Sequence, residues 1–422
     1  MIKKLWKKYK KTKSFKRLQK TFPYRALRKV YRKCKKIAGK IDKYIMFRHV
    51  YPNLYKEMSK KEVNSRKVVF IEGRMAEITN SFSYLYDKLS KDDRYDVSVV
   101  YLRMSFLKKK AYKKRCKEMI CEIADASVVF LNDSSNVIAC LPMREETKVV
   151  QLWHACGAFK KFGMSIADYK FGEDRKTLEK YPYHGNYTYM TVSSPEVVWA
   201  FEEAMNLQDK KGIVVPTGVS RTDYFYDNNV VEKAYRKFYD LFPYAKGKKI
   251  ILYAPTFRGR VAKAKTPNKL DIMQFYEELS KEYVLVFKHH PFVKKRTKIP
   301  EECLEFAVDC TDTMSIDELL CISDICISDY SSLVFEYSLF EKPMLFYAFD
   351  LDDYYDWRGF YYDYKDFVPG PIYSENQEMI DYIKNIDTKF DKQQVIDFKN
   401  KFMGPCDGHA TDRIIDLVFN DK

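Results

Sequence analysis

Short apolar runs alternate with helix-like stretches from Lys67 almost to the end of this chain, and this alternation constrains the fold more than any other feature. Apolar runs of strand length separated by helical segments favour parallel sheets with crossover helices. The expected strands form one series at 68–72, 97–102, 127–131, 149–153, 189–192 and 213–216, and a second at 250–254, 284–287, 306–308, 325–328 and 344–348. Helix-like segments such as 272–279 and 316–322 lie between them. Two such series predict two α/β domains.

The length of 422 residues fits two domains at roughly 100 to 200 residues each. The first series ends near Gly218, and a helical connector runs from there towards Lys246. We therefore expect an N-terminal arm at 1–58, a first Rossmann-like domain at 59–225, and a second one with C-terminal helices at 226–422.

The formal net charge of +17 belongs almost entirely to the arm. Residues 1–43 hold 19 Lys and Arg and a single acid, Asp42, so the remainder of the chain is close to neutral. A DNA- or RNA-binding face built into the fold would place the excess charge in the body instead. The composition therefore argues against nucleic acid as a partner.

Apolar residues recur in the arm at steps of three and four, with Lys and Arg between them, which predicts a basic amphipathic helix. The stripe consists of Phe15, Leu18, Phe22, Ala26, Val30, Cys34, Ile37, Ile41 and Ile45. Such a helix suits an anionic membrane surface. The alternatives are a solvated basic tail or a segment that docks on the body or on RNA.

Other features predict an intracellular protein that does not span a membrane. The N-terminus has no apolar segment typical of a secretory signal, and no apolar run approaches the ~20 residues of a membrane-spanning helix. The ten cysteines lack zinc-site spacing and are expected to be reduced thiols. We predict no metal site, and we attribute the aspartates Asp350, Asp352 and Asp353 to turn chemistry.

Ligands of open parallel sheets bind beyond the carboxyl ends of the strands, so the residues that follow each strand are the candidates for function. His154 follows the fourth strand and is suited to proton transfer near neutral pH. His290, preceded by Lys288 and His289, follows the strand at 284–287. Three further histidines, His49, His184 and His409, receive no functional role.

Hydroxyl and backbone groups that would suit a phosphate follow two strands of the second series. Pro255 and Thr256 come after the strand at 250–254, and Ser331 and Ser332 come after the strand at 325–328. Small residues that open a helix offer O–H and N–H donors to a phosphate. Glu336 lies one turn further on and could accept hydrogen bonds from ribose hydroxyls.

Together these segments resemble, in order and approximate spacing, the CDP-glycerol glycerophosphotransferase family of teichoic acid biosynthesis. The resemblance runs from about Val149 to Ile380. It rests on Gln151-Leu152-Trp153-His154, Gly218-Val219-Ser220-Arg221-Thr222-Asp223, Tyr253-Ala254-Pro255-Thr256, His290-Pro291, Ser328-Asp329-Tyr330-Ser331-Ser332, Lys342-Pro343-Met344, Arg358-Gly359-Phe360-Tyr361 and Pro369-Gly370-Pro371.

The resemblance implies a GT-B architecture, in which two Rossmann-like domains flank a cleft. The domain at 59–225 would bind the acceptor, and the domain at 226–422 would bind the CDP-polyol. Polyol phosphate would pass from CDP-glycerol or CDP-ribitol to a hydroxyl of a lipid-linked, undecaprenyl-type acceptor, with release of CMP. The family is held at the inner membrane face by basic residues, and no cofactor is firmly implied.

Carried over by position, the resemblance implies roles for single residues. His154 matches a proposed catalytic base, and His290 matches a histidine proposed to act at the phosphate. The predicted donor-binding set is Arg221, Pro255, Thr256, Lys288, His289, Ser331, Ser332 and Glu336. Two departures from the family pattern are Ala155, where a glycine usually follows the first histidine, and Lys288, where an arginine is common. Lysine keeps the charge of arginine but loses its bidentate fork.

Two alternatives stay open at this point. One keeps the fold and replaces the CDP-polyol with a nucleotide sugar, as in a GT-B glycosyltransferase. The other is a membrane- or RNA-binding adaptor whose α/β body is inactive. The choice between CDP-glycerol and CDP-ribitol, the number of units added, the acceptor, metal dependence and the oligomeric state are also open.

Overall fold

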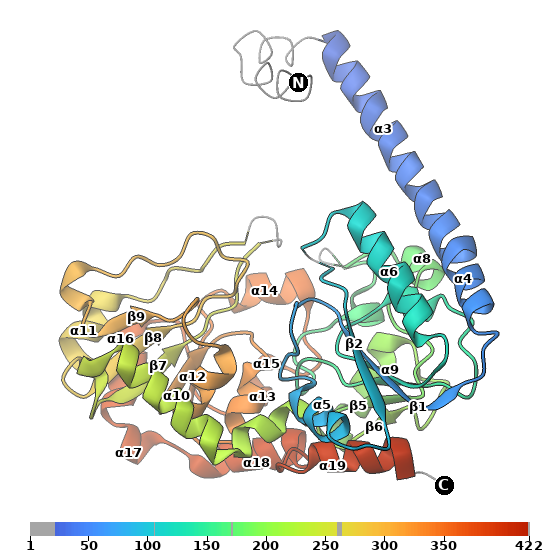
Figure 1. Ribbon diagram of the computed structural model, residues 1–422. Helices are drawn as coiled ribbons and strands as arrows, with labels where there is room; N and C mark the ends of the chain where they lie inside the picture. Colours follow the sequence, from blue (N-terminus) through green and yellow to red (C-terminus); the bar gives the residue numbers. More distant parts are fainter. Residues whose placement is uncertain (1–21, 105, 170–171, 260–263, 421–422) are drawn as a thin grey trace.

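The computed structural model describes residues 22–104, 106–169, 172–259 and 264–420. Two parallel sheets lie side by side, and a long helix projects from the N-terminal lobe (Figure 1). This arrangement confirms the predicted α/β architecture with two Rossmann-like halves and a helical arm. Each predicted strand overlaps an observed one.

The N-terminal sheet has six strands in the order β2-β1-β3-β4-β5-β6, and every pair is parallel. Its strands are β1 (Asn64–Glu72), β2 (Asp96–Tyr101), β3 (Ala126–Leu131), β4 (Lys148–Gln151), β5 (Tyr189–Thr191) and β6 (Val214–Val215). Its helices are α5 (Ser83–Ser90), α6 (Lys109–Ile123), α7 (Asn136–Ala139), α8 (Arg175–Lys180) and α9 (Val198–Met205). The central strands β1 and β3 carry continuous buried apolar runs because helices and the C-terminal segment cover both faces.

The C-terminal sheet has the order β12-β11-β10-β7-β8-β9 and is also parallel. Its strands are β7 (Lys249–Tyr253), β8 (Tyr283–Phe287), β9 (Ala307–Asp309), β10 (Ile325–Ser328), β11 (Met344–Tyr347) and β12 (Ile372–Tyr373). Its helices are α10 (Asn228–Leu241), α11 (Ile272–Leu279), α12 (Ile316–Ile322), α13 (Leu333–Ser338), α14 (Leu351–Arg358), α15 (Tyr364–Phe367), α16 (Asn376–Lys384) and α17 (Ile386–Lys389). The two-residue edge strand β12 is absent from the predicted strands, since Ile372 and Tyr373 follow Pro369-Gly370-Pro371 and are not part of a longer apolar run.

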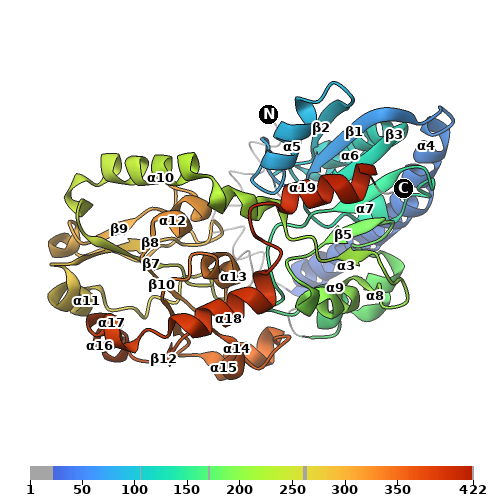
Figure 2. The same ribbon diagram turned by 90° about the horizontal axis from the view of Figure 1, so that it is seen from below.

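The chain crosses between the lobes a second time near its C-terminus. Helix α18 (Lys392–Met403) packs on α13 of the second lobe, and α19 (Ala410–Ile415) then lies against the first lobe (Figure 2). Ile414 and Val418 share a buried apolar cluster with Val68 and Phe70 of β1. The predicted boundary at 225/226 stays a prediction, but the C-terminal segment packs on the N-terminal lobe.

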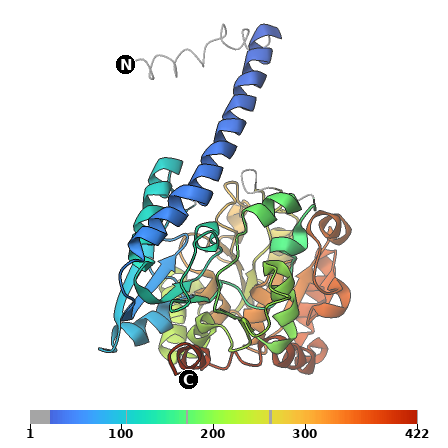
Figure 3. The ribbon, with the colours of Figure 1, turned by 90° about the vertical axis from the view of Figure 1, so that its right-hand side faces the viewer.

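The arm is anchored at its base and exposed along most of its length. Helix α3 (Phe22–Ile45) projects away from the body (Figure 3) and leads through a π-helical turn into α4 (Tyr51–Met58), whose Tyr51 and Tyr55 are buried. Asp42 pairs with Lys109 and Lys113 of α6. The exposed apolar residues of α3 include Val30, Ile37 and Ile41 of the predicted stripe and Leu27, which lies beside it. Phe15 and Leu18 lie outside the described residues.

Among the described helices, none combines the length and the apolar character that crossing a membrane requires.

Candidate active site

The loops at the carboxyl ends of the two sheets meet between the lobes. Lys160, beyond β4, forms an antiparallel bridge with Phe360 of the C-terminal lobe. Phe159 packs against Phe335 and Phe367 of that lobe, with ring centroids 6.4 and 5.1 Å apart. The segment that carries His154 is therefore built into the contact between the lobes.

His154 is held by the loop after the neighbouring strand β3. Its Nδ1 lies 3.0 Å from the backbone carbonyl oxygen of Asn132. Because a carbonyl oxygen only accepts hydrogen bonds, Nδ1 carries the proton and Nε2 keeps its lone pair. Burial lowers the pKa of His154, an effect that Asp133 opposes. The residue is therefore neutral at pH 7 and has the form that a general base requires.

Two unusual backbone conformations flank His154. Trp153 has φ 62°, which is rare for a bulky residue, and its ring stands 4.6 Å from the His154 ring. Gly157 has φ 62°, and a Cβ there would approach the Phe335 ring to within 2.2–2.3 Å. Glycine is required at 157 because the backbone touches the opposite lobe.

His290 is exposed, and the rings of Phe257 and Phe292 lie 4.9 and 4.5 Å from its ring. The backbone N–H of Phe292 donates to its Nδ1 at 3.2 Å. Nδ1 is therefore the acceptor, and Nε2 carries the proton in the neutral ring. Desolvation, together with the positive charges of Lys160 and Arg74, lowers the pKa of His290 to about 4. His290 is thus a neutral hydrogen-bond donor at pH 7.

The two residues before His290 are turned to other partners. Lys288 donates to the carbonyl oxygens of Thr311, at 2.9 Å, and Met314, and burial lowers the pKa of its ammonium group. His289 is 1% exposed, and neither ring nitrogen has a hydrogen-bond partner within the described part of the chain. Only His290 of this trio is exposed.

Arg221 lies in a buried network that joins the lobes. Its guanidinium donates to the carbonyl oxygen of His154 and to Asp317 of α12, each at 2.5 Å, and lies 3.6 Å from Glu336. Asn80 donates to the other oxygen of Asp317 at 2.6 Å. Arg221 therefore couples the His154 loop to the C-terminal lobe.

Glu336 of α13 is only 3% exposed, and its Oε2 has no hydrogen-bond partner among the described residues. Burial raises the pKa of this carboxyl group, and Arg221 opposes that rise. The structure brings Glu336 together with Arg221 and His154.

The remaining predicted donor-binding residues lie after β7 and β10. Pro255 is buried, and the backbone N–H of Thr256 donates to Asp329 at 2.8 Å. Ser331 and Ser332 precede α13, and the Ser331 hydroxyl accepts a long bond of 3.4 Å from the backbone N–H of Leu333. The two segments are thus adjacent across neighbouring strands.

An ion-pair network that the sequence reasoning missed joins these two segments. Arg258 donates to Asp329 at 2.9 Å and, through two nitrogens, to Asp350 at 2.6 and 2.8 Å. Asp329 also accepts from the Tyr330 backbone N–H at 2.7 Å. Asp329 directly follows the predicted strand at 325–328, and Arg258 lies four residues after the predicted strand at 250–254. Their position in the segments after these strands was the signal that could have identified them.

A second missed residue is Arg74, which follows β1. Its Nε donates to Asp133, the neighbour of the Asn132 that holds His154. The side chain is 48% exposed, and its charge lowers the pKa of both His154 and His290. Arg74 is therefore a cation close to both histidines.

No group of three or more His, Cys, Asp or Glu that could hold a metal ion occurs in the described ranges. Asp350 is paired with Arg258, and Asp352 and Asp353 form the first turn of α14 rather than a loop turn.

Comparison with known proteins identifies the family. The sequence profile of "CDP-Glycerol:Poly(glycerophosphate) glycerophosphotransferase" matches residues 53–420. The chain is 36% identical over 376 residues to a teichoic acid ribitol-phosphate primase of Bacillus spizizenii, covering 87% of this chain and 95% of the relative. It is 33% identical over 402 residues to a Staphylococcus aureus teichoic acid ribitol-phosphate polymerase, covering 94% of this chain and 68% of that protein.

The chain is 30% identical over 299 residues to a Bacillus subtilis teichoic acid glycerol-phosphate primase, covering 70% of this chain and 74% of that protein. In three dimensions the chain resembles the wall teichoic acid polymerase TagF in its H548A variant. The TM-score is 0.72 at 23% identity, over 94% of this chain and 97% of that one. This likeness concerns the fold. The profile match and the sequence relatives show that the chain belongs to the CDP-glycerol:poly(glycerophosphate) glycerophosphotransferase family.

Proposed function

We propose that this protein transfers ribitol phosphate from CDP-ribitol to a hydroxyl of a membrane-bound acceptor in teichoic acid synthesis, and releases CMP. Family membership supports the transfer of a polyol phosphate from a CDP-polyol over the transfer of a sugar and over an inactive adaptor. The observation that carries the choice of polyol is the degree of similarity. Identity is 36% over 95% of a ribitol-phosphate primase and 30% over 74% of a glycerol-phosphate primase.

The proposed reaction is an in-line displacement at phosphorus. The acceptor oxygen attacks the β-phosphorus, and its proton passes to Nε2 of His154. The bond between the β-phosphorus and the bridging oxygen breaks, so CMP leaves and the acceptor keeps the polyol phosphate. His290 Nε2–H and the Arg74 guanidinium would stabilise the phosphoryl charge, the effect that dominates such reactions. The protonation states derived for the two histidines support these assignments.

The proposed donor set comprises Arg221, Pro255, Thr256, Lys288, His289, Ser331, Ser332 and Glu336. Lys288 uses two of its three ammonium protons on backbone carbonyls, which leaves one for a phosphate oxygen. The Arg221 side chain is only 14% exposed and His289 is buried, and we assign them the role of holding the loops that contact the donor. Thr256 Oγ1 and Glu336 Oε2 are buried polar atoms without partners in the described residues, as groups reserved for a ligand would be.

We also place the protein at the inner face of the cell membrane, where a lipid-linked acceptor would be embedded. The support for this position is the arm, whose apolar side chains are exposed among Lys and Arg along α3. Each basic residue near an anionic surface contributes about 1 kcal/mol to binding.

The test is CMP release by the full-length protein on anionic vesicles that carry a lipid-linked acceptor. CDP-ribitol, CDP-glycerol and a UDP-sugar are compared as donors, and we expect the highest kcat/KM with CDP-ribitol. His154→Ala and His290→Ala should each lose most of the activity, whereas His409→Ala, at a histidine 73% exposed in its side chain, should retain it. Wild-type turnover in both active-site variants, or a preference for the UDP-sugar, would refute the proposal.

A further inference from the structure

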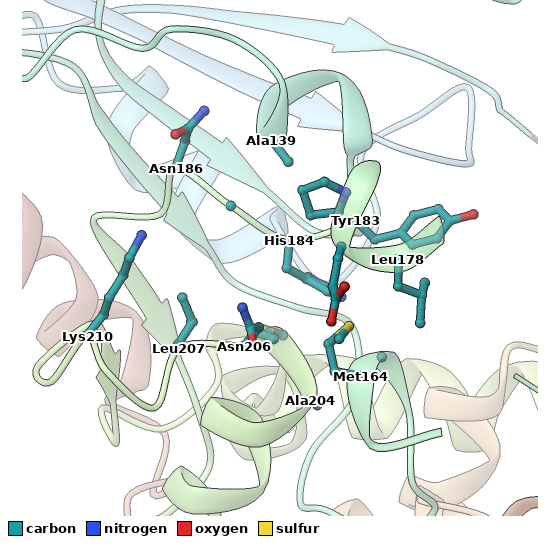
Figure 4. A pocket seen from close by; sticks show the side chains of 15 residues that line it. Ala139, Met164, Leu178, Tyr183, His184, Asn186, Ala204, Asn206, Leu207 and Lys210 are labelled. Atoms are coloured by element: carbon teal, nitrogen blue, oxygen red, sulfur yellow. The ribbon is translucent and has the colours of Figure 1, made fainter. Parts of the chain in front are cut away.

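A cavity of about 350 Å³ lies in the N-terminal lobe, apart from the two candidate catalytic histidines. Segments from α7, α8, α9 and the loops beside them form its wall. The side chains of His184, Met164 and Asn206 lie around it (Figure 4). Its volume is in the range of ligand pockets, roughly 300–1,000 Å³. Neither His184 nor any other residue of this lining belongs to the predicted catalytic or donor-binding set.

Aromatic contacts connect the cavity to His154. The His184 ring lies 5.6 Å from the Trp153 ring, and Trp153 lies 4.6 Å from the ring of His154. His184 Nδ1 is fixed by the Tyr187 hydroxyl at 3.1 Å. The Trp153 ring therefore lies between the cavity residue His184 and the candidate base His154.

The same wall holds the base of the arm. Arg48 donates to the carbonyl oxygen of Lys180 at 3.0 Å, and the Lys43 ammonium lies 4.3 Å from the centre of the Tyr181 ring. Lys180 is the last residue of α8, and Glu179 beside it lines the cavity. The cavity thus lies between the segment proposed to contact the membrane and the candidate base.

The charges of the lining favour a neutral ligand. The lining contains one acidic side chain, Glu179, and one basic side chain, Lys210, so its formal net charge is zero. Burial lowers the pKa of His184 to about 4, so its imidazole is neutral at pH 7. By contrast, Arg74 and Lys160 place positive charge around His290, which suits an anionic donor. Hydrogen-bonding groups beside apolar Met164 and Leu207 suit a ring or chain rich in hydroxyls.

We propose that this cavity binds a neutral, hydroxyl-rich group of the acceptor, a sugar or a polyol, that lies between its lipid and the hydroxyl that reacts at His154. The proposal rests on the proposed function, since it assigns a binding subsite to the acceptor of that transfer. It makes the cavity a determinant of acceptor recognition and leaves donor binding to the cleft.

The test fills the cavity without touching the cleft. Met164→Trp and, independently, Ala139→Leu reduce its volume, and Met273→Trp on α11 of the other lobe is the matched control. We expect each cavity variant to raise KM for the lipid-linked acceptor about tenfold or more. Release of CMP from the CDP-polyol with water or glycerol as acceptor should keep the wild-type rate, which also shows that the variants fold.

Two acceptors separate the sources of the hydroxyl-rich group. One carries a sugar between the lipid and the reactive hydroxyl, and the other carries an uncharged polyol there and no sugar. If KM rises only for the acceptor with the sugar, the group bound in the cavity is a sugar. If KM also rises for the acceptor without the sugar, the group is a polyol. An unchanged KM for both acceptors in both variants would overturn the cavity proposal while the wild-type enzyme still turns over CDP-polyol. Absence of CDP-polyol turnover in the wild-type enzyme would instead refute the proposed function.

Discussion

Two backbone groups decide which nitrogen of each candidate catalytic histidine carries the proton. The Asn132 carbonyl leaves Nε2 of His154 as an acceptor, and the Phe292 N–H leaves Nε2 of His290 as a donor. The sequence could locate both histidines because each lies within three residues of a strand end. It could not predict the tautomer of His154, because Asn132 belongs to the loop after a different strand and meets His154 only through sheet pairing.

The depressed pKa values of the two histidines predict the pH dependence of the reaction. Burial lowers the pKa of His154 below its ordinary value, and the pKa of His290 is about 4, so both rings are mostly neutral at pH 6.5. Since the base must be neutral to accept a proton, activity should be lost only as the pH falls below the ordinary histidine range. We expect the acidic limb of a kcat/KM–pH profile to lie below 6.5. A limb at or above 6.5 would contradict this environment for His154.

Replacement of Arg74 should slow transfer without abolishing folding. Arg74 is 48% exposed and its charge lowers the pKa of both histidines, so Arg74→Ala removes a cation from the proposed phosphoryl site. We expect kcat/KM to fall about 100-fold, the size typical for the loss of one charge-stabilising donor. Arg74→Lys should recover part of the activity, and Arg103→Ala, on the next exposed loop, is the control. Equal activity in Arg74→Ala and Arg103→Ala would exclude Arg74 from the site.

At the level of elements, three strand-end loops of the C-terminal sheet are tied into one unit. Arg258 after β7, Asp329 after β10 and Asp350 after β11 share the ion pairs described above. The strands themselves were predictable from their apolar runs. The ion pairs were not, because they depend on the strand order β11-β10-β7, which places loops distant in sequence beside one another.

Asp329→Asn tests this unit. The amide oxygen can still accept from the Thr256 and Tyr330 N–H groups, but the ion pair with Arg258 is lost at a residue that is 2% exposed. We expect KM for the CDP-polyol to rise about tenfold, with a free energy of unfolding lower by about 3 kcal/mol. Asp352→Asn, at an exposed residue of α14, should change neither quantity. Donor kinetics and urea unfolding supply the measurements, and an unchanged KM would remove Asp329 from donor positioning.

At the level of the whole molecule, the two lobes are packed together, and one buried apolar cluster includes residues of both. Arg221 and Gly157 both reach the C-terminal lobe from the N-terminal one. The segments that carry Arg221 and Gly157 were recognisable in the sequence. Their partners Asp317 and Phe335 were not, because no sequence pattern links either partner to these segments. Spatial contact between lobes leaves no local pattern in a single sequence.

Gly157→Ala should destabilise this contact. The new Cβ would overlap the Phe335 ring, and φ 62° is unfavourable for alanine. We expect the free energy of unfolding to fall by about 2 kcal/mol or more and transferase activity to drop with it. Gly39→Ala in the exposed helix α3 meets no atom within 4 Å and should be neutral or slightly stabilising. Equal unfolding midpoints for the two variants would contradict the packing at Gly157.

Deletion of residues 1–43 tests the arm. The anchor formed by Tyr51 and Tyr55 of α4 remains, so the body should fold. We expect binding to anionic vesicles in a flotation assay to be lost, whereas turnover with a soluble acceptor analogue is kept. Wild-type binding should itself weaken with added salt, because screening reduces the attraction of the basic residues. Loss of both activities on deletion would mean that the arm belongs to the fold.

The return of α19 to the first lobe has a consequence for engineering donor choice. Since Ile414 and Val418 complete the apolar cluster around Val68 and Phe70, the C-terminal lobe is an insertion within the N-terminal one. A chimaera joined once, near residue 226, would exchange part of the N-terminal lobe along with the C-terminal lobe. A cassette exchange between relatives of different polyol preference therefore needs two junctions, one before α10 and one after α18. Single-crossover recombinants within this family should misassemble far more often than double-crossover ones.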